Sequence, residues 1–187
     1  LGGIVDAQSA SEAAAQRIEP AINSPEQAQL WQPHRDKPAT IHLDTGMQRL
    51  GFSASELGAL DVSSFNVSMV MTHLACADTP DHPTNNMQLD AFQQCLKQFP
   101  NVPTSIANSA GCLLPEDWHG DLTRPGIGLY GGHPQNRIPD NPLSAVVSMR
   151  GRVVARRTVA AGSAVGYGGT FIAQRPTEVA VPYWFSL

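Results

Sequence analysis

The sequence predicts an α/β protein in which a parallel sheet covered by helices is followed by a smaller β-rich domain. Short apolar runs alternate with amphipathic stretches through most of the 187 residues, and polar loops separate them. This order is typical of a parallel sheet, of which a barrel is one closed form. After a turn-rich linker at residues 133–142, β-branched runs follow one another with no helical segment between them. The predicted domains are therefore residues 1–142 and 143–187.

Five apolar runs are the candidate strands of the first domain. They are bounded by turn residues and carry side chains that suit a buried strand. In chain order they are residues 18–23 (IEPAIN), 40–44 (TIHLD), 66–74 (NVSMVMTHL), 104–108 (TSIAN) and 122–130 (LTRPGIGLY). We expect the last run to be the closing strand of the series.

Three helices are predicted in the segments between these strands. Ser24 can cap the first, which starts with a proline and runs to about Trp31, because proline is tolerated in a first helical turn. Either Ser53 or Ser55 can cap a second helix near the sequence SELGAL. A third helix is expected at residues 85–98, where apolar side chains recur at helical spacing. Its apolar face consists of Met87, Phe92, Cys95, Leu96 and Phe99.

The composition excludes several classes of partner. The net charge is −4, only 15% of the residues are charged, and no basic run occurs, so nothing in the sequence attracts nucleic acid or an anionic membrane surface. No apolar run approaches the roughly 20 residues that span a bilayer, and the first residues lack the pattern of a signal peptide. We therefore expect a cytoplasmic protein with small-molecule or protein partners.

Metal and disulfide chemistry are not indicated. The three cysteines fit neither a C-x-x-C motif nor a metal-finger spacing, so reduced thiols are expected. One loop holds Asp78, Asp81 and His82, but these residues have no recognised ligand spacing. No metal site is therefore predicted.

Two polar residues follow apolar strands where a site can form. Arg49 lies in the turn DTGMQRLG (residues 44–51), and it is either a surface arginine or a side chain that contacts an anion. His73 lies at the end of the strand before LACAD, and it faces a pocket if the sheet is a barrel with its active site at the carboxyl ends of the strands. The alternative for His73 is a core histidine with its hydrogen bonds satisfied.

Two glycine-containing turns are candidates for binding phosphate. NSAG (residues 108–111) and RPGIG (residues 124–128) both follow apolar runs, and their small residues allow backbone N–H groups to approach an anion closely. In barrels the phosphate site is frequently built from the loops after the last two strands. The alternative is a pair of ordinary strand-to-helix turns.

Tyr167 lies among three glycines in the stretch AVGYGGT (residues 164–170). Such a turn is commonly a hairpin or a bulge. As a base, the phenol needs its pKa lowered from about 10 to near neutrality, which requires cationic or donor groups nearby. His73 and an arginine can supply them.

Taken in order, these stretches resemble the alanine racemase family, the fold-type III enzymes that use pyridoxal phosphate. The matching runs are EPAINSPEQAQLW, HLDTGMQRLGF, MTHLACAD, IANSAG, RPGIGLYG and VGYGGTF, which span residues 18–173. The resemblance implies a partial TIM (β/α)8 barrel, containing about the last five strands, followed by the beginning of a C-terminal β domain. It also implies pyridoxal 5'-phosphate as cofactor and alanine as substrate.

The resemblance implies roles for the residues of the two glycine-containing turns. Arg124 is similar to the arginine that hydrogen-bonds the pyridine nitrogen of the cofactor. Ser109, with backbone groups of Gly126 and Ile127, resembles the phosphate cradle. Asn108 lies in the same stretch.

The resemblance also implies roles for three other side chains. Arg49 resembles the arginine near the phenolic oxygen of the cofactor and the substrate carboxylate. Tyr167 is similar to the base that exchanges the α proton on one face, and His73 to its hydrogen-bond partner. In the family this tyrosine acts in the site of the partner subunit, so a head-to-tail homodimer is implied.

Three departures from the family pattern affect the expected activity. The family holds its cofactor with a lysine in a V-x-K-A-N-A-Y-G-H-G stretch, whereas the only lysines here are Lys37 and Lys97. By the same comparison three of the eight barrel strands precede Leu1. His42 stands where many members have a lysine, often carbamylated, that orients the arginine matched by Arg49. We therefore expect these 187 residues alone to be inactive.

Two other functions are alternatives to a racemase. One is a non-catalytic pyridoxal-phosphate-binding barrel protein, but those relatives lack a β domain. The other is an amino-acid decarboxylase of the same fold, whose glycine triplet is absent here. The racemase reading predicts interconversion of L-alanine and D-alanine, a precursor of peptidoglycan, while serine or another small substrate stays open.

Overall fold

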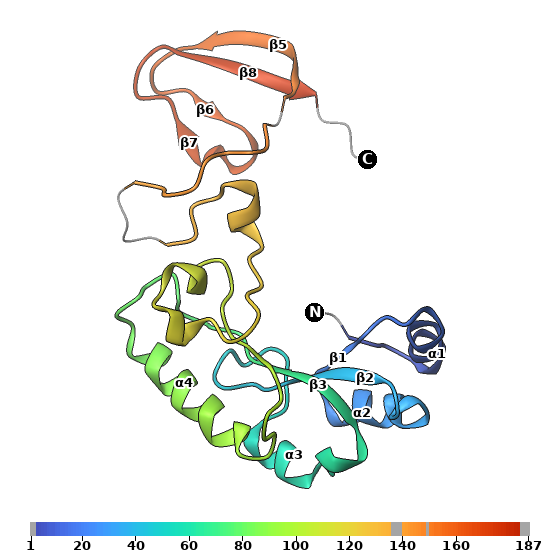
Figure 1. The fold of residues 1–187 in the computed structure, drawn as a ribbon. Coiled ribbons are helices and arrows are strands. Elements are labelled where there is room, and N and C mark those ends of the chain that lie inside the picture. The colour runs from blue at the N-terminus through green and yellow to red at the C-terminus, as the bar shows by residue number, and fades with distance from the viewer. Residues whose placement is uncertain (1–2, 136–139, 149, 184–187) are drawn as a thin grey trace. The chain divides into compact units, whose positions relative to one another are not determined.

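The computed structural model describes residues 3–135, 140–148 and 150–183. The chain divides into two compact units, Leu1–Val146 and Val147–Leu187. Figure 1 shows helices and a sheet in the first unit and antiparallel strands in the second. Each unit is described by itself.

The first unit is built on a parallel sheet. Its four strands are β1 (Ala21–Ile22), β2 (Pro38–His42), β3 (Asn66–Met71) and β4 (Thr104–Ser105). They lie in the order β1-β2-β3-β4, and every neighbouring pair is parallel. Because all four strands run in the same direction, their carboxyl ends lie at one edge of the sheet. The predicted parallel α/β sheet is confirmed.

The expected strand at residues 122–130 is wrong. Ser105 forms an isolated bridge with Gly120, and the backbone then turns into the 3-10 helix Ile127–Tyr130. Pro125 has no N–H to donate to a ladder, and Gly131 ends this helix with a φ of 77°. Within the described residues the first unit therefore has four strands, and the expected count of about five is not confirmed.

Helices follow three of the strands, and one helix precedes them. They are α1 (Ala7–Gln16), α2 (Pro25–Trp31), α3 (Ala54–Ala59) and α4 (Pro83–Leu96). Ser24 caps α2 as expected by accepting the N–H of Gln27 at 3.3 Å. The sequence analysis did not predict α1, whose run of alanines has a high helix propensity but only a weak apolar pattern.

The predicted apolar face of α4 is confirmed except at Met87, which is 68% exposed. Phe92 and the following Phe99 are buried, and Cys95 and Leu96 pack against the core. The buried face also includes two polar residues, Asn85 and Gln88, at helical spacing from Phe92. The apolar pattern therefore found most of this face but not its polar members.

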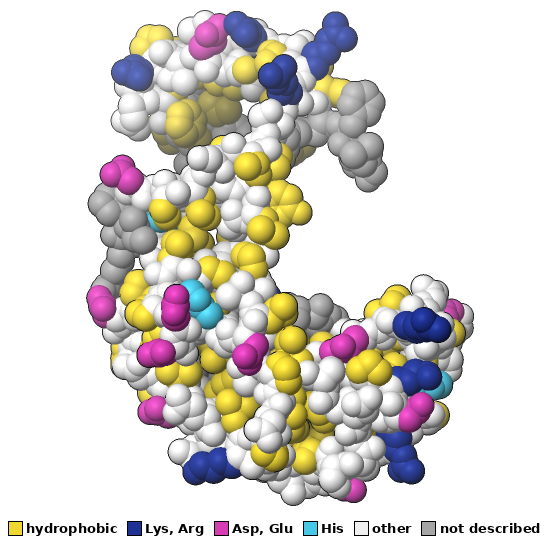
Figure 2. Space-filling model, viewed as in Figure 1, with side chains coloured by type: hydrophobic (Ala, Val, Ile, Leu, Met, Phe, Trp, Pro, Cys, Tyr) yellow, Lys and Arg dark blue, Asp and Glu magenta, His cyan; other side chains and the backbone are white. Residues whose placement is uncertain are grey.

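The core lies between the sheet and the helices. Its largest fully buried apolar side chains come from β1, β2 and β3, from α2, α3 and α4, and from the loops after β2 and β3. They include Trp31, Ile41, Leu43, Phe52, Leu57, Val70, Leu74 and Phe92. None of the helices in the described residues is long and apolar enough to cross a membrane. On the face seen in Figure 2, charged side chains of both signs lie among polar and apolar ones.

The second unit is made of antiparallel strands. β5 (Arg152–Val159) pairs with β8 (Thr177–Tyr183), and β6 (Ala164–Val165) pairs with β7 (Phe171–Ile172). The 3-10 turn Tyr167–Gly169 connects β6 to β7. It starts after Gly166 at φ 79°, a conformation that L side chains rarely adopt.

We predict that Ser53, and not Ser55, stabilises α3. Ser53 accepts the N–H of Glu56, and its own N–H donates to the Glu56 carboxylate at 2.8 Å, which completes a capping box. Replacing Ser53 with alanine should lower the free energy of unfolding by about 1 kcal/mol, measured by chemical denaturation. Ser55→Ala is the matched control and should change it by only a few tenths. Equal losses in both variants would contradict this assignment.

Candidate functional site

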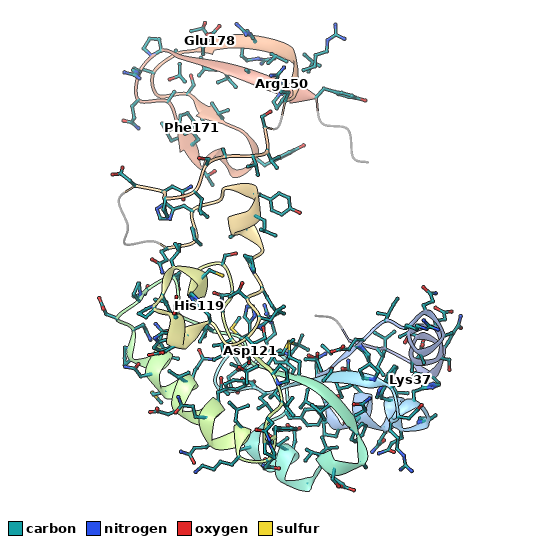
Figure 3. All side chains as sticks on the ribbon, in the orientation of Figure 1. Lys37, His119, Asp121, Arg150, Phe171 and Glu178 are labelled. Atoms are coloured by element: carbon teal, nitrogen blue, oxygen red, sulfur yellow. The ribbon has the colours of Figure 1, made fainter. Side chains whose placement is uncertain are left out.

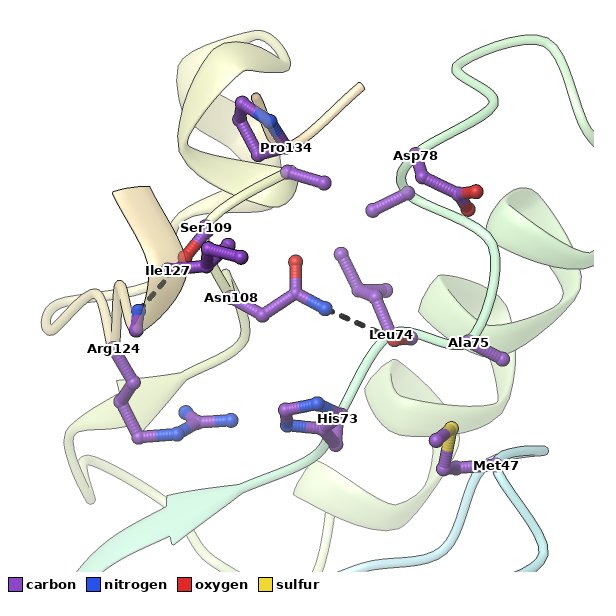
Figure 4. A pocket seen from close by; sticks show the side chains of 13 residues that line it. Met47, His73, Leu74, Ala75, Asp78, Asn108, Ser109, Arg124, Ile127 and Pro134 are labelled. Carbon is purple, nitrogen blue, oxygen red and sulfur yellow. Dashed lines mark hydrogen bonds between the residues drawn. The ribbon is translucent and has the colours of Figure 1, made fainter. Parts of the chain in front are cut away.

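A cavity of about 450 Å³ lies in the first unit, beside the loops that follow β3 and β4. Its volume is within the range of ligand pockets, and its place at the carboxyl ends of parallel strands is where α/β folds bind ligands. Figure 4 shows its walls. The lining residues are Met47, His73, Leu74, Ala75, Ala77, Asp78, Asn108, Ser109, Ala110, Arg124, Gly126, Ile127 and Pro134.

The cavity brings together most of the site residues predicted in the first unit. His73 and Arg124 line it. The other predicted residues in its lining come from the two glycine-containing turns and are Asn108, Ser109, Gly126 and Ile127. Arg49 does not line the cavity. Its side chain is exposed, and Met47 is the residue of its turn that lines the wall. The charge of Arg49 nevertheless contributes to lowering the pKa of His73.

Arg124 is a partly buried cation that makes no ion pair within the described residues. Its guanidinium donates to the Ser105 hydroxyl and to the Thr72 carbonyl, and its backbone N–H donates to Ala107 at 2.8 Å. Among the residues that the structure describes, none accepts a hydrogen bond from the buried Nε–H. Burial lowers the pKa of Arg124, yet a guanidinium keeps its proton at neutral pH. The group is therefore a fixed donor available to an acceptor or anion.

His73 faces Arg124 across the cavity (Figure 4). Burial, the Arg124 charge and the Arg49 charge all lower the pKa of His73, in that order of size. Its Nδ1 is buried and forms no hydrogen bond with any part of the chain that the structure describes. The imidazole is consequently neutral near pH 7, with one nitrogen able to donate and the other to accept.

The opposite end of the cavity is lined by small residues whose backbone N–H groups converge on the Ser109 hydroxyl. The Ser109 hydroxyl accepts the N–H groups of Gly126 at 2.7 Å and Gly128 at 3.1 Å. Asn108 donates to the Leu74 carbonyl at 3.1 Å, which joins the two loops that form the walls (Figure 4). These bonds hold RPGIG against NSAG, as a compact anion site requires.

His42 lies buried at the end of β2, and only 3% of it is exposed. Its Nδ1 is 2.7 Å from Oδ1 of Asn23. Since the Asn23 amide nitrogen donates to Ala21 and Gln27, its oxygen is the acceptor, and the network assigns the proton to Nδ1 of His42. Burial, followed by the Arg124 charge, lowers the pKa of His42 to about 4. His42 is therefore a neutral group beside cationic ones.

Tyr167 belongs to the second unit and is fully exposed. Three glycines around it at φ 79°, 72° and 59° form the turn that presents the ring. The phenol makes no hydrogen bond within the described part of its unit. In the part of the chain described, no group of three or more His, Cys, Asp or Glu is placed to hold a metal.

A family model described as alanine racemase, N-terminal domain, matches residues 1–134. The chain belongs to the alanine racemase family. Alanine racemase of Rhodospirillum rubrum is 42% identical over 171 residues, which cover 86% of this chain and 46% of that protein. Catabolic alanine racemase of Agrobacterium fabrum is 44% identical over 177 residues, covering 89% and 45%. The chain thus spans about half the length of the curated relatives it matches.

Solved alanine racemases share the fold. The enzyme from Bartonella henselae, described as having covalently bound pyridoxal phosphate, superposes with a TM-score of 0.77 at 36% identity and covers 97% of this chain. The biosynthetic enzyme from Pseudomonas aeruginosa gives a TM-score of 0.79 at 32% identity and covers 96%. This chain covers 53% of each of them.

The sequence did not predict the residues that support the walls of the cavity from outside. Ser105 and Thr72 hold Arg124, and Gln135 donates its amide to the carbonyls of Ala77 and Ala110 in the two pocket walls. Ser105 and Thr72 sit at buried positions beside apolar strand residues. A polar residue at a core-facing strand position was the available signal, because such a group must find a partner.

We predict that stability falls as the pH drops from about 6.5 towards 4. The unfolded chain binds protons at histidines with pKa near 6.5, whereas His42 in the folded chain has a pKa of about 4, and that of His73 is also lowered. Above pH 6.5 this contribution to the free energy of unfolding is fully present. Between pH 6.5 and pH 4, His42 alone lowers the free energy of unfolding by about 3 kcal/mol. Chemical denaturation at a series of pH values measures it.

His42→Gln should flatten most of this pH dependence. His34→Gln is the matched control, since His34 lies on a surface turn before β2, and its profile should keep the full slope. A flat profile in the unmodified chain, or an unchanged slope in His42→Gln, would count against the buried neutral histidine.

Proposed function

We propose that this chain supplies the cofactor pocket and one proton-exchanging base of a pyridoxal-phosphate-dependent enzyme that interconverts L-alanine and D-alanine. The single observation that carries the proposal is Arg124, a pocket-lining cation with an unpaired buried N–H, together with the family membership. The proposal places a TIM-barrel portion at residues 1–142 and the beginning of the C-terminal β domain at residues 143–187. It also includes a cytoplasmic homodimer that supplies D-alanine for peptidoglycan.

The residues of the cavity fit pyridoxal phosphate. The cofactor has a ring nitrogen that accepts a hydrogen bond and a phosphate that needs several donors. Arg124 offers an Nε–H with no partner among the described residues, and Ser109 offers its O–H at the other end of the cavity. The Gly126 N–H donates to the Ser109 oxygen in this structure and would turn to a bound phosphate. Asn108 lies between these ends and holds the wall (Figure 4). Arg124 would thus hold the ring, and the loop the phosphate.

When bound, pyridoxal phosphate supplies an electron sink that makes the α proton of an amino acid removable. Arg124 keeps its own proton, so it would donate a hydrogen bond to the ring nitrogen without transferring that proton. Thr72 and Ser105 fix its guanidinium from behind, which limits its reorientation. His73 stays neutral beside it and can pass a proton at an imidazole nitrogen.

Tyr167 and Arg49 complete the proposed chemistry. Tyr167 is the base for one face of the substrate, and it acts in the site of the second subunit of a head-to-tail homodimer. Its full exposure on a glycine-rich turn leaves the phenol open to a partner. Arg49, which is also exposed, binds the substrate carboxylate with its planar fork of donors.

Neither lysine of the chain is placed to hold the cofactor covalently. Figure 3 shows Lys37 in the segment that leads into β2, and this segment therefore lies at the amino end of the strand. Lys97 is the C-cap residue of α4. The cavity lies at the carboxyl ends of the strands. We therefore expect these 187 residues to bind the cofactor without racemising alanine.

We predict that the chain binds pyridoxal phosphate through Arg124. Replacing Arg124 with glutamine removes the charge and should weaken binding about ten-fold, or about 1.4 kcal/mol, in a fluorescence titration. Arg35→Gln is the matched control, because Arg35 is an exposed arginine on the turn before β2. Equal affinities for Arg124→Gln and the unmodified chain would overturn the assignment.

We predict that Tyr167 is required for α-proton exchange on one face. The test uses a chimaera in which this chain replaces the matching segment of the Rhodospirillum rubrum relative. Tyr167→Phe should lower solvent deuterium exchange at least about 100-fold from one alanine enantiomer, as expected for loss of a general base. Tyr130→Phe is the control, since that exposed tyrosine lies outside the cavity. Release of carbon dioxide without racemisation would instead favour the decarboxylase alternative.

A further inference from the structure

Gln88 is a polar residue of α4 that is completely buried. Its neighbours on the buried face of the helix are Asn85 and Phe92. An amide removed from water costs free energy unless its donors and acceptor are paired. The partners of Gln88 therefore show what the residue does in this position.

All three hydrogen bonds of the amide go to loops at the carboxyl edge of the sheet. Its Oε1 accepts the N–H of Ala75 at 2.8 Å. Its Nε2 donates to the carbonyl of His73 at 3.0 Å and to the hydroxyl of Thr45 at 3.2 Å. The partners also fix which atom is oxygen, because an N–H must meet the oxygen and a carbonyl must meet the nitrogen.

The bonds to His73 and Ala75 hold two points of the pocket wall. They hold the backbone on either side of Leu74, and His73, Leu74 and Ala75 follow one another along the cavity (Figure 4). Rotation of either flanking peptide breaks one of the bonds. The direction in which the His73 side chain leaves the backbone is thus set by a helix that lies outside the cavity lining.

The third bond extends the network to the turn that carries Arg49. Thr45 shares a hydrogen bond of 2.7 Å with the hydroxyl of Thr72, which donates to Leu43 at 2.9 Å. The Thr72 carbonyl in turn accepts a bond from Arg124. A Cβ on Gly46 would lie 3.2 Å from Cγ of Gln88, so the turn packs directly on this side chain.

We infer that Gln88 is a positioning residue that fixes His73 and the adjoining pocket wall through three hydrogen bonds. Its consequence for catalysis rests on the proposed function, but the positioning itself can be measured without cofactor. Gln88→Met has a similar shape and lacks all three bonds. Gln88→Glu keeps the acceptor for Ala75 and, when ionised, loses both donors.

The primary experiment records the imidazole NMR signals of His73 and the amide hydrogen exchange of Ala75 in the 187-residue chain. Gln88→Met should shift the His73 signals and speed exchange at Ala75. Gln88→Glu should shift His73 while Ala75 stays protected. Gln93→Met, on the exposed face of α4, should change neither. Phe92→Leu loosens the buried face of the same helix and controls for a loss of packing, so it should leave the His73 signals in place.

The second readout is the affinity for pyridoxal phosphate alone. We expect Gln88→Met to weaken it about ten-fold and both control variants to leave it within about two-fold. Unchanged His73 signals in Gln88→Met, or an equal shift in Phe92→Leu, would overturn the positioning role. If the unmodified chain binds no pyridoxal phosphate but the His73 signals still move as expected, the proposed function fails while the role of Gln88 stands.

Discussion

The site depends on a buried cation that has no carboxylate partner among the described residues. Arg124 is held by neutral groups, the hydroxyl of Ser105 and the carbonyl of Thr72, and one of its N–H groups is left over. Removing a guanidinium from water is costly, and neutral acceptors offset only part of that cost. Burial, and after it the Arg124 charge, lowers the pKa of both His73 and His42, so the cation lies among neutral side chains.

The parallel sheet explains why distant sequence segments meet at this cation. His42 ends β2, His73 follows β3, and Asn108 follows β4, so all three lie at the same edge. Beyond the ends of the strands, hydrogen bonds between the loops take the place of the hydrogen bonds between strands. Asn108 reaches the Leu74 carbonyl, and Gln88 reaches the carbonyl of His73 from α4. The strands bring the loops together, and buried amides fix their conformation.

Much of the first unit could be predicted from the sequence. Apolar runs located the four strands, and Ser24 identified the start of α2, because these are local signals. Residues 122–130 also carry an apolar run, but Pro125 and the glycines around it favour a 3-10 turn that no periodicity shows. The apolar residues of the buried face of α4 were predicted, but Asn85 and Gln88 were not, because their hydrogen bonds allow these polar side chains to be buried.

Most residues that line the cavity were predicted from the sequence, but the residues that hold them in place were not. His73 and NSAG were predicted from motifs after strands and RPGIG from its glycines, and residues of all three line the cavity. Ser105, Thr72 and Gln88 act through partners far away in the chain, so no local pattern could connect them to Arg124 or His73. Such long-range contacts are visible only once the strands are paired.

The most direct test of the central claim is a crystal structure of this chain with pyridoxal phosphate. The account predicts a cofactor in the cavity, with its ring nitrogen on Arg124 and its phosphate at the loop of Ser109, Gly126 and Ile127. A phosphate bound at Arg124, or a cofactor bound outside this cavity, would contradict it.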